Sequence, residues 1–506
     1  MAHILLGANT KGEPVTLPLA MANRHGLIAG ATGTGKTVSL QVLAEGFSRH
    51  GIPVFTADIK GDLAGMSVRG TPHQKIDERV KKIGISNYTQ EPNPVVFWDI
   101  YGKNGHPVRT TISEMGPLLL SRLLLLSDTQ DAVLHMAFKI ADDNGMLLLD
   151  IKDLQQFLVW MSEKSEELQR TYGKISGSTL ASIQRQLLVL NESGGDVFFG
   201  EPALKITDVM KKDFSGRGIV HILDAQKLME NPTIYSTFML WLLSELFEKL
   251  PEVGDSEKPK MVFFFDEAHL LFEDAPKVLL TKIKQVARLI RSKGVGVYFV
   301  SQNPLDIPDD IRGQLGNRIQ HALRAFTPRD QKAVQSAAET FRANPDFDTA
   351  EVIGSLQTGE ALVSTLDEKG RPRVVQQTLM CPPRSKMGSI SEEVRHEKVH
   401  NSPFSGIYDT PIDRESAYEL LKKNVETPRQ EQKKKDVEPE EEYYEQYAKQ
   451  LPKKEKEEEG LLKIFDTGKR QGYVETMAKQ LARSMARKAG TKIMNAVLRG
   501  IMGGLK

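Results

Sequence analysis

Residues 25–37 read HGLIAGATGTGKT, and this stretch decides the fold. Its last eight residues match the phosphate-loop pattern G-x-x-x-x-G-K-[ST] in full: Gly30, Ala31, Thr32, Gly33, Thr34, Gly35, Lys36 and Thr37. An apolar run typical of a short buried strand precedes the loop, and a helical pattern follows it to about His50. Glycines let successive backbone N–H groups point at an anion, and the helix N-terminus adds a positive partial charge. We therefore expect the loop to hold the phosphates of a nucleotide, with Lys36 at the β- and γ-phosphates and the Thr37 hydroxyl on Mg²⁺.

The residues around the loop predict an α/β fold. PVFTADI at 53–59 is a second strand-like run, so strand, helix and strand follow one another as a βαβ unit. Such units build a parallel sheet covered by helices. Before the loop, residues 1–24 are typical of a strand pair, and 360–380 predict a closing hairpin with its turn at 367–370.

Composition and periodicity divide the 506-residue chain into five parts. We expect residues 1–111 to form the first part of the core and 112–215 to be a Leu-rich helical insertion. Residues 216–380 then complete the core. Residues 381–460 predict a charged linker, and 461–506 predict a basic amphipathic helix.

A second motif supplies carboxylates. MVFFFDE at 261–267 is an apolar strand that ends in Asp266 and Glu267. Ligands bind at this end of the strands in an open parallel sheet. We expect Asp266 to bind Mg²⁺, and Glu267 to orient and deprotonate a water molecule as the catalytic base.

A third strand-like run, VGVYFVSQ at 295–302, ends in Gln302, which could contact the γ-phosphate or the attacking water. An arginine supplied by a neighbouring subunit can stabilise the charge that develops during phosphoryl transfer. The candidates for this role are Arg288, Arg291, Arg312, Arg318 and Arg324.

Several other classes of protein are excluded or disfavoured. The single cysteine, Cys381, cannot form an internal disulfide or a cysteine-based zinc site. The chain contains no guanine-reading Asn-Lys-x-Asp motif, which favours ATP over GTP, and no H-E-x-x-H spacing. The first residues, MAHILLGANTKGEP, do not read as a signal peptide, and no apolar stretch reaches the roughly 20 residues of a membrane span, so we expect a cytoplasmic protein.

These motifs together resemble the HerA–FtsK group of P-loop ATPases, and more narrowly the bacterial HerA-like proteins formerly classed as a domain of unknown function. The resemblance covers about residues 1–380. It rests on six blocks in family order: HGLIAGATGTGKT (25–37), TADIKGDLAGM (56–66), GEPAL (200–204), FFFDEAHLLF (263–272), RLIRSKGVGVYFVSQNP (288–304) and LGNRIQHALRAFTPRDQKAV (315–334).

The resemblance implies a RecA-like core of the additional-strand, catalytic-glutamate class, and a ring, usually a hexamer, that moves double-stranded DNA with ATP. It assigns the nucleotide and sensor roles to Lys36, Thr37, Asp266, Glu267 and Gln302. It also places Asp58 and Asp62 in an acidic motif of unassigned role, and ranks Arg318 above Arg291 as the arginine that faces a neighbouring subunit. HerA helicases usually carry an N-terminal β-barrel that binds a nuclease partner, and the 29 residues before Gly30 are too few for one.

Charge is unevenly distributed along the chain. The net charge is +1, but residues 461–506 carry ten basic and two acidic side chains, a net +8, which leaves −7 for residues 1–460. Near neutrality therefore does not exclude a nucleic-acid protein. The basic tail could pack on its own ring, bind a phosphate backbone or lie on an anionic membrane surface.

Three functions fit these patterns. The first is a Mg²⁺-dependent ATPase that translocates on double-stranded DNA. The second is an ATP-driven switch or scaffold that remodels a protein partner, and the third is a membrane-associated assembly ATPase.

Overall fold

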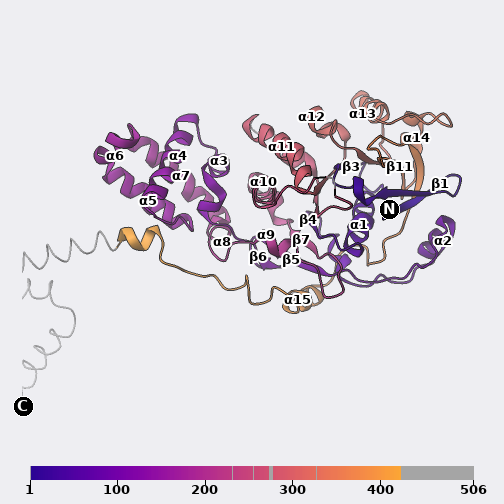
Figure 1. Ribbon diagram of the computed structural model, residues 1–506, viewed down its shortest axis with the longest axis horizontal. Helices are drawn as coiled ribbons and strands as arrows, with labels where there is room; N and C mark the ends of the chain where they lie inside the picture. The colour runs from indigo at the N-terminus through magenta and orange to yellow at the C-terminus, as the bar shows by residue number, and fades with distance from the viewer. Residues whose placement is uncertain (1, 231, 255, 273–276, 326, 423–506) are drawn as a thin grey trace, which may run out of the picture. The chain divides into compact units, whose positions relative to one another are not determined.

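The computed structural model describes residues 2–230, 232–254, 256–272, 277–325 and 327–422. The chain divides into two units, Met1–Thr427 and Pro428–Lys506, and the second lies outside the described residues. The described residues form a twelve-stranded sheet in the order β2-β1-β12-β11-β10-β3-β9-β8-β4-β7-β5-β6 (Figure 1). Its strands are β1 His3–Asn9, β2 Pro14–Pro18, β3 Gly26–Ala29, β4 Val54–Asp58, β5 Val95–Asp99, β6 His106–Pro107, β7 Val220–Asp224, β8 Met261–Phe265, β9 Val295–Ser301, β10 Asn317–Gln320, β11 Glu360–Ser364 and β12 Gln376–Met380.

The sheet is parallel from β10 through β3 to β6 and antiparallel at the β1, β2, β11 and β12 end. Strand β9 lies between β3, which leads into the phosphate loop, and β8, which leads into the acidic pair. The predicted RecA-like α/β fold is therefore confirmed.

Helices cover both faces of the sheet. Because both faces are buried, the central strands carry apolar side chains on both sides. In β8, Phe263 and Phe265 pack into one hydrophobic core, whereas Val262 and Phe264 pack into the other. Phe264 meets Phe47 of α1, with ring centroids 6.4 Å apart. Besides the insertion, the helices are α1 Lys36–Arg49, α2 Gln74–Ile83, α10 Pro232–Lys249, α11 Lys277–Leu289, α12 Asp309–Arg312, α13 Pro328–Glu339, α14 Thr349–Ser355 and α15 Glu392–His400.

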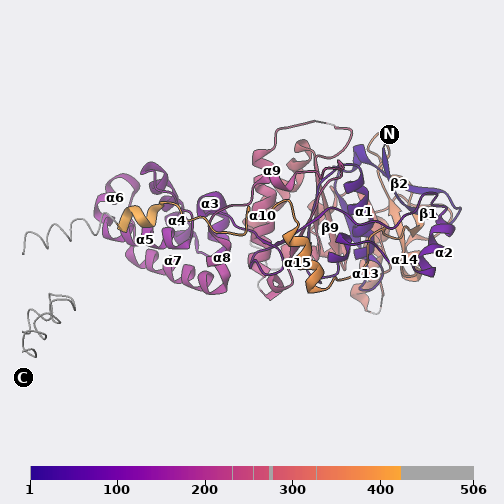
Figure 2. The ribbon, with the colours of Figure 1, turned by 90° about the horizontal axis from the view of Figure 1, so that it is seen from below.

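The stretch expected to be a helical insertion is helical. It contains α3 Ile112–Leu123, α4 Asp128–Asp143, α5 Ile151–Glu163, α6 Ser165–Tyr172, α7 Gly177–Leu190, α8 Asp196–Phe198 and α9 Ile206–Val209. Helices α4, α5 and α7 pack on one another (Figure 2), and α3 also contacts α10 of the core. That residues 112–215 are an insertion into the ATPase core stays a prediction.

The structure differs from the expected linker at 381–460 in its first part. Residues 381–422 pack on the core, where Phe404 and Tyr408 are buried and their ring centroids lie 5.5 and 5.3 Å from that of Trp98, in tilted and edge-on orientations. The two aromatic residues Phe404 and Tyr408 hold this segment on the core. The average composition of residues 381–460 does not reveal them, because the strongly charged run at 426–460 dominates it. The rest of the linker and the basic helix at 461–506 lie outside the described residues.

Strands β5 and β10 and helix α2 were not expected from the sequence. The β10 residues, NRIQ, are too few and too polar to read as a strand, although β10 pairs directly with β3. No helix among the described residues has both the length and the apolar character of a membrane span.

Candidate functional site

The phosphate loop connects β3 to α1, as its sequence predicts. Gly33 and Gly35 have φ values of 78° and 118°, in the left-handed region that side chains with a Cβ avoid. A Cβ added to Gly30 would lie 2.5 Å from the Cβ of His321, so this position also requires glycine. The loop backbone is therefore free to approach a ligand, which is what a phosphate cradle needs.

Lys36 is buried at the first position of α1. Its Nζ donates to the carbonyl oxygens of Gly30, at 2.7 Å, and Ala31, at 3.2 Å. Burial, and then the positive charge of Lys60, lower the pKa of Lys36. An anion placed against Lys36 would offset both effects, so the surroundings of the lysine suit a phosphate.

His321 supports the loop from behind, a role that no sequence pattern indicated. Its Nδ1 lies 2.9 Å from the carbonyl oxygen of Glu360, which can only accept, so Nδ1 carries the proton. Its Nε2 then accepts from the Ser39 hydroxyl of α1 at 2.8 Å. Burial lowers the pKa of His321 to about 4, so the ring is neutral near pH 7.

The acidic pair lies where β8 ends. Asp266 is buried, and burial followed by the neighbouring charge of Glu267 raises the pKa of Asp266 to about 7. One Asp266 oxygen accepts from the backbone N–H of Glu267 at 2.9 Å, and the buried Tyr235 hydroxyl donates to the Asp266 carbonyl at 3.1 Å. Glu267 itself has φ 46° and ψ 52°, a left-handed conformation that costs a non-glycine residue roughly 1–2 kcal/mol. Backbone strain of this kind gathers at functional sites.

The Glu267 carboxylate is surrounded by donors. Lys60 Nζ lies 2.5 Å from one oxygen, His269 Nδ1 lies 3.4 Å from the other, and Gln302 Nε2 lies 3.3 and 3.4 Å from the two. Burial acts to raise the pKa of Glu267, but Lys60, Gln302 and His269 together outweigh burial and lower the pKa below its ordinary value, with Lys60 as the largest of the three. Glu267 is therefore ionised near neutral pH, as a base must be.

Gln302 connects the acidic pair to the phosphate loop. Its side-chain oxygen lies 3.3 Å from the Thr32 hydroxyl, while its amide nitrogen faces Glu267. The structure thus brings the predicted loop, the predicted carboxylate and the predicted sensor into one network. Thr37 occupies the second position of α1, on the same loop.

Asp58 and Asp62, placed by resemblance in an acidic motif, shape the loop after β4. The Asp58 carboxylate accepts from the backbone N–H groups of Asp62, at 3.0 Å, and Leu63, at 3.1 Å. Burial, followed by the charge of Asp62, raises the pKa of Asp58 to about 6. This loop carries Lys60, which sequence reasoning missed because a lone lysine after a strand has no distinguishing pattern.

The two arginines ranked for a role in trans have partners in their own chain. The Arg318 guanidinium donates to the carbonyl oxygens of Leu315, Thr340 and Arg312, at 3.0 to 3.2 Å. Arg291 lies in the 3-10 helix η6, Ile290–Lys293, and also has an interaction within the chain. Contact of either arginine with a neighbouring subunit stays a prediction.

A hollow of about 450 Å³ begins at Gly35 and Val38, beside the first turn of α1. The Arg79 guanidinium lies at its wall and donates to the carbonyl oxygen of Gly359 at 2.9 Å. The remaining lining is mostly apolar with a basic rim: Ile76, Met380, Cys381, Pro382, Pro383 and Met387, with His73, Lys75 and Lys386.

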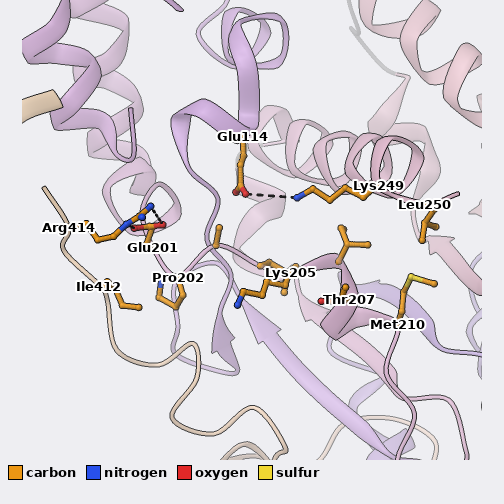
Figure 3. Close-up of a pocket in the computed structure, with 13 residues that line it drawn as sticks. Glu114, Glu201, Pro202, Lys205, Thr207, Met210, Lys249, Leu250, Ile412 and Arg414 are labelled. Atoms are coloured by element: carbon orange, nitrogen blue, oxygen red, sulfur yellow. Dashed lines mark hydrogen bonds and ion pairs between the residues drawn. The ribbon is translucent and has the colours of Figure 1, made fainter. Parts of the chain in front are cut away.

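A second hollow, of about 540 Å³, lies where the insertion joins the core (Figure 3). Its charged residues face one another: Arg414 binds both oxygens of Glu201 at 2.5 and 2.7 Å, and Lys249 lies 4.0 Å from Glu114. None of the phosphate-loop residues lines it. Two of its cations, Arg414 and Lys249, are paired with carboxylates of the chain, which makes this hollow a poor match for a triphosphate.

A model of the family described as Helicase HerA-like C-terminal matches residues 3–506. The chain belongs to this family. The DNA double-strand break repair helicase HerA of Saccharolobus solfataricus is 24% identical over 368 residues, which are 71% of this chain and 64% of the relative. The protein of the same name from Sulfolobus acidocaldarius is 22% identical over 365 residues, 71% of this chain and 65% of the relative. This HerA-like chain therefore spans less than two thirds of the length of these curated relatives.

Among solved structures, the bacterial conjugative coupling protein TrwB matches with a TM-score of 0.49 at 15% identity, over 76% of this chain and 90% of TrwB. VirB4 of Thermoanaerobacter pseudethanolicus matches with a TM-score of 0.48 at 16% identity, over 74% of this chain and 96% of VirB4.

Proposed function

We propose that this HerA-like chain hydrolyses ATP with Mg²⁺ and uses the energy to move along double-stranded DNA. The position of Glu267 is the observation that supports ATP hydrolysis. An ionised carboxylate stands at the end of the strand beside β9 and is joined through Gln302 to Thr32 of the phosphate loop. A water molecule between Glu267 and the γ-phosphate would lose a proton to the carboxylate as its oxygen attacks phosphorus.

Magnesium fits the oxygen donors at this edge. Thr37 and Asp266 offer a hydroxyl and a carboxylate, which are ligands of the kind that Mg²⁺ prefers. The described residues contain no group of three or more His, Cys, Asp or Glu side chains that could hold a metal by themselves. This suits a cation that completes its shell with phosphate oxygens and water. When bound, Mg²⁺ would neutralise charge on the phosphates.

The apolar hollow beside α1 supports a nucleoside site. Phosphates held by Gly30–Thr37 would leave the nucleoside to extend past the first turn of α1, where Gly35 and Val38 open into the hollow. Its apolar walls suit the faces of a purine ring, and its size is within the usual range for small-molecule sites, about 300–1,000 Å³. The preference for ATP over GTP is part of this proposal.

Action on DNA is supported by family membership and by the names of two relatives, which are DNA double-strand break repair helicases. Assembly into a ring, usually a hexamer, is what the resemblance of the sequence motifs to HerA–FtsK ATPases implies. The basic segment 461–506, or loops inside a ring, would provide contact with the phosphate backbone. A protein partner, a membrane surface bound by that segment and a cytoplasmic location stay predictions.

The test is ATP hydrolysis by the full chain with Mg²⁺, measured with and without double-stranded DNA at low and high salt, together with its mass in the presence of nucleotide. We expect DNA to stimulate hydrolysis, the stimulation to fall with salt as phosphate contacts are screened, and the mass to correspond to a ring. Hydrolysis that no DNA changes in low salt would contradict translocation and favour the ATP-driven switch that remodels a protein partner. A monomeric mass with nucleotide would contradict the ring.

A further inference from the structure

Lys60 stands in a loop whose shape is fixed by its neighbours. Asp58 accepts two backbone N–H groups of the loop, as described above. Gly61 has a φ of 75°, in the left-handed region that residues with a Cβ rarely adopt, so the turn here favours glycine. The backbone at Lys60 is therefore held beside the end of β8, because β4 and β8 are paired neighbours in the sheet.

The Lys60 ammonium group binds one oxygen of Glu267, the carboxylate that is proposed as the base. At 2.5 Å it forms a charge-assisted hydrogen bond, one of the strong kinds in proteins. A carboxylate held in this way is a weaker acceptor for a proton from water. In the nucleotide-free protein the Lys60–Glu267 pair therefore restrains the base.

Lys60 is also connected to the phosphate loop. Its charge acts on the buried Lys36, so the two ammonium groups lie near each other. Thr32 of the phosphate loop contacts Gln302, Gln302 contacts Glu267, and Glu267 contacts Lys60, so these contacts link the phosphate loop to Lys60. The Lys60 side chain is 41% exposed, against 4% for Glu267, so the lysine has room to change partners while the carboxylate stays in place.

The geometry points to Lys60 as a γ-phosphate-sensing residue that holds Glu267 in the absence of ATP and moves to the γ-phosphate when ATP binds. This inference rests on the proposed function. The γ-phosphate offers more negative charge than a single carboxylate and draws the ammonium group away, since Coulomb attraction scales with charge. Glu267 then accepts a proton from the attacking water, the water oxygen bonds to the γ-phosphorus and the β–γ bridging bond breaks, which gives ADP and inorganic phosphate. Lys60 keeps its protons throughout and stabilises charge on the transferred group.

The experiment compares the affinity for ADP with that for the non-hydrolysable analogue AMPPNP, both with Mg²⁺, by calorimetry, alongside kcat and KM for ATP. The variants are Lys60→Met, Lys60→Arg and Glu267→Gln, with Lys284→Met as the matched control. Lys284 pairs with Asp310 at 2.6 Å and its side chain is 37% exposed, so it resembles Lys60 in geometry but lies outside the proposed site.

We expect Lys60→Met to keep its ADP affinity, to lose about tenfold in AMPPNP affinity and to lower kcat more than it changes KM, as removal of a charged hydrogen bond predicts. Lys60→Arg should restore part of the AMPPNP preference. Glu267→Gln should bind AMPPNP several-fold more tightly than wild type, because Lys60 no longer has to leave a carboxylate, and adding Lys60→Met should remove that gain. Lys284→Met should match wild type throughout.

Two results would overturn the inference: a Lys60→Met variant with the wild-type ratio of AMPPNP to ADP affinity, or a Glu267→Gln variant with no gain in AMPPNP affinity. A role of Lys60 in folding alone would lower ADP and AMPPNP affinity together in both Lys60 variants, and that result also counts against the inference. Failure of the wild-type chain to bind ADP at all would instead contradict the proposed function.

Discussion

Two of the places where the described residues bring carboxylates and cations together, the end of β8 and the hollow of Figure 3, differ in burial and in their surroundings. At the end of β8, the Glu267 side chain is 4% exposed, has a left-handed backbone and is joined through Gln302 to the phosphate loop. In the hollow of Figure 3, Glu201 is 18% exposed and Glu114 is 38% exposed, and their partners Arg414 and Lys249 are more than half exposed.

The difference teaches that residue type alone does not identify a catalytic pair. In the hollow, Arg414 pairs with Glu201 and Lys249 lies near Glu114. Both cations reach solvent, where ion pairs contribute little free energy. The pair at β8 is held by strand ends, strained backbone and a buried neighbour, Asp266, whose raised pKa shows how unfavourable its charge is without a cation. Four variants test this contrast.

Glu267→Gln should have the largest effect. It keeps the shape of the side chain but removes the base, so kcat should fall by about 10²–10⁴-fold. ATP binding should be retained, because the phosphate loop is untouched. A phosphate-release assay beside a binding titration checks both, and a variant with substantial residual turnover would show that another group activates the water.

Lys36→Ala should act on binding itself. It removes a charged donor from the phosphates, which corresponds to about 3 kcal/mol or roughly 100-fold in ATP affinity. Titration with ATP and Mg²⁺ measures the change. Wild-type affinity in this variant would mean that nucleotide does not bind at the loop.

Asp266→Asn should stabilise the protein at alkaline pH when nucleotide and divalent cations are absent. The pKa of Asp266 is about 7 in the folded chain, above the value of about 3.9 for an unfolded chain, so the fold favours the protonated carboxyl. The cost of ionising it therefore grows as the pH rises from about 4 and is complete above 7. Asn avoids that cost, so we expect a free energy of unfolding about 1–3 kcal/mol above wild type at pH 8 and most of that gain to be absent near pH 4.5.

Urea denaturation in EDTA at the two pH values measures this gain, with Asp310→Asn as the surface control. Asp310 also carries a carboxylate with a lysine partner, but its side chain is 72% exposed. An Asp266→Asn variant that is less stable than wild type at pH 8 would show that the Asp266 charge is already compensated in the free protein.

Arg414→Met should have the smallest effect. It breaks the exposed pair with Glu201, and such pairs contribute about 0.2–1 kcal/mol. We expect a thermal unfolding midpoint close to that of wild type and unchanged ATP hydrolysis. A large loss of hydrolysis would give the hollow in Figure 3 a role that its geometry does not indicate.

Much of the nucleotide edge could be predicted from the sequence because it depends on local pattern. Gly30–Thr37, the DE pair after five apolar residues and Gln302 each follow a strand, and parallel strands bring their ends to one edge. The order of the strands is not local, and the placement of β9 between β3 and β8 is known only from the strand pairing in the structure.

What could not be predicted depends on contacts between distant residues. Lys60 and Glu267 are far apart in sequence and meet only because β4 pairs with β8. His321 follows a polar four-residue strand and supports α1 through Ser39. Residues 381–422 were expected to be linker because Phe404 and Tyr408, which anchor them, are single aromatic residues without periodicity.

Release of inorganic phosphate from ATP and Mg²⁺, measured side by side for wild type, Glu267→Gln and Arg414→Met, tests the central claim most directly. The account predicts that Arg414→Met matches wild type and that Glu267→Gln releases almost no phosphate although it binds ATP. Equal activity in all three, or no phosphate release by the wild-type chain with Mg²⁺ and double-stranded DNA, would contradict it.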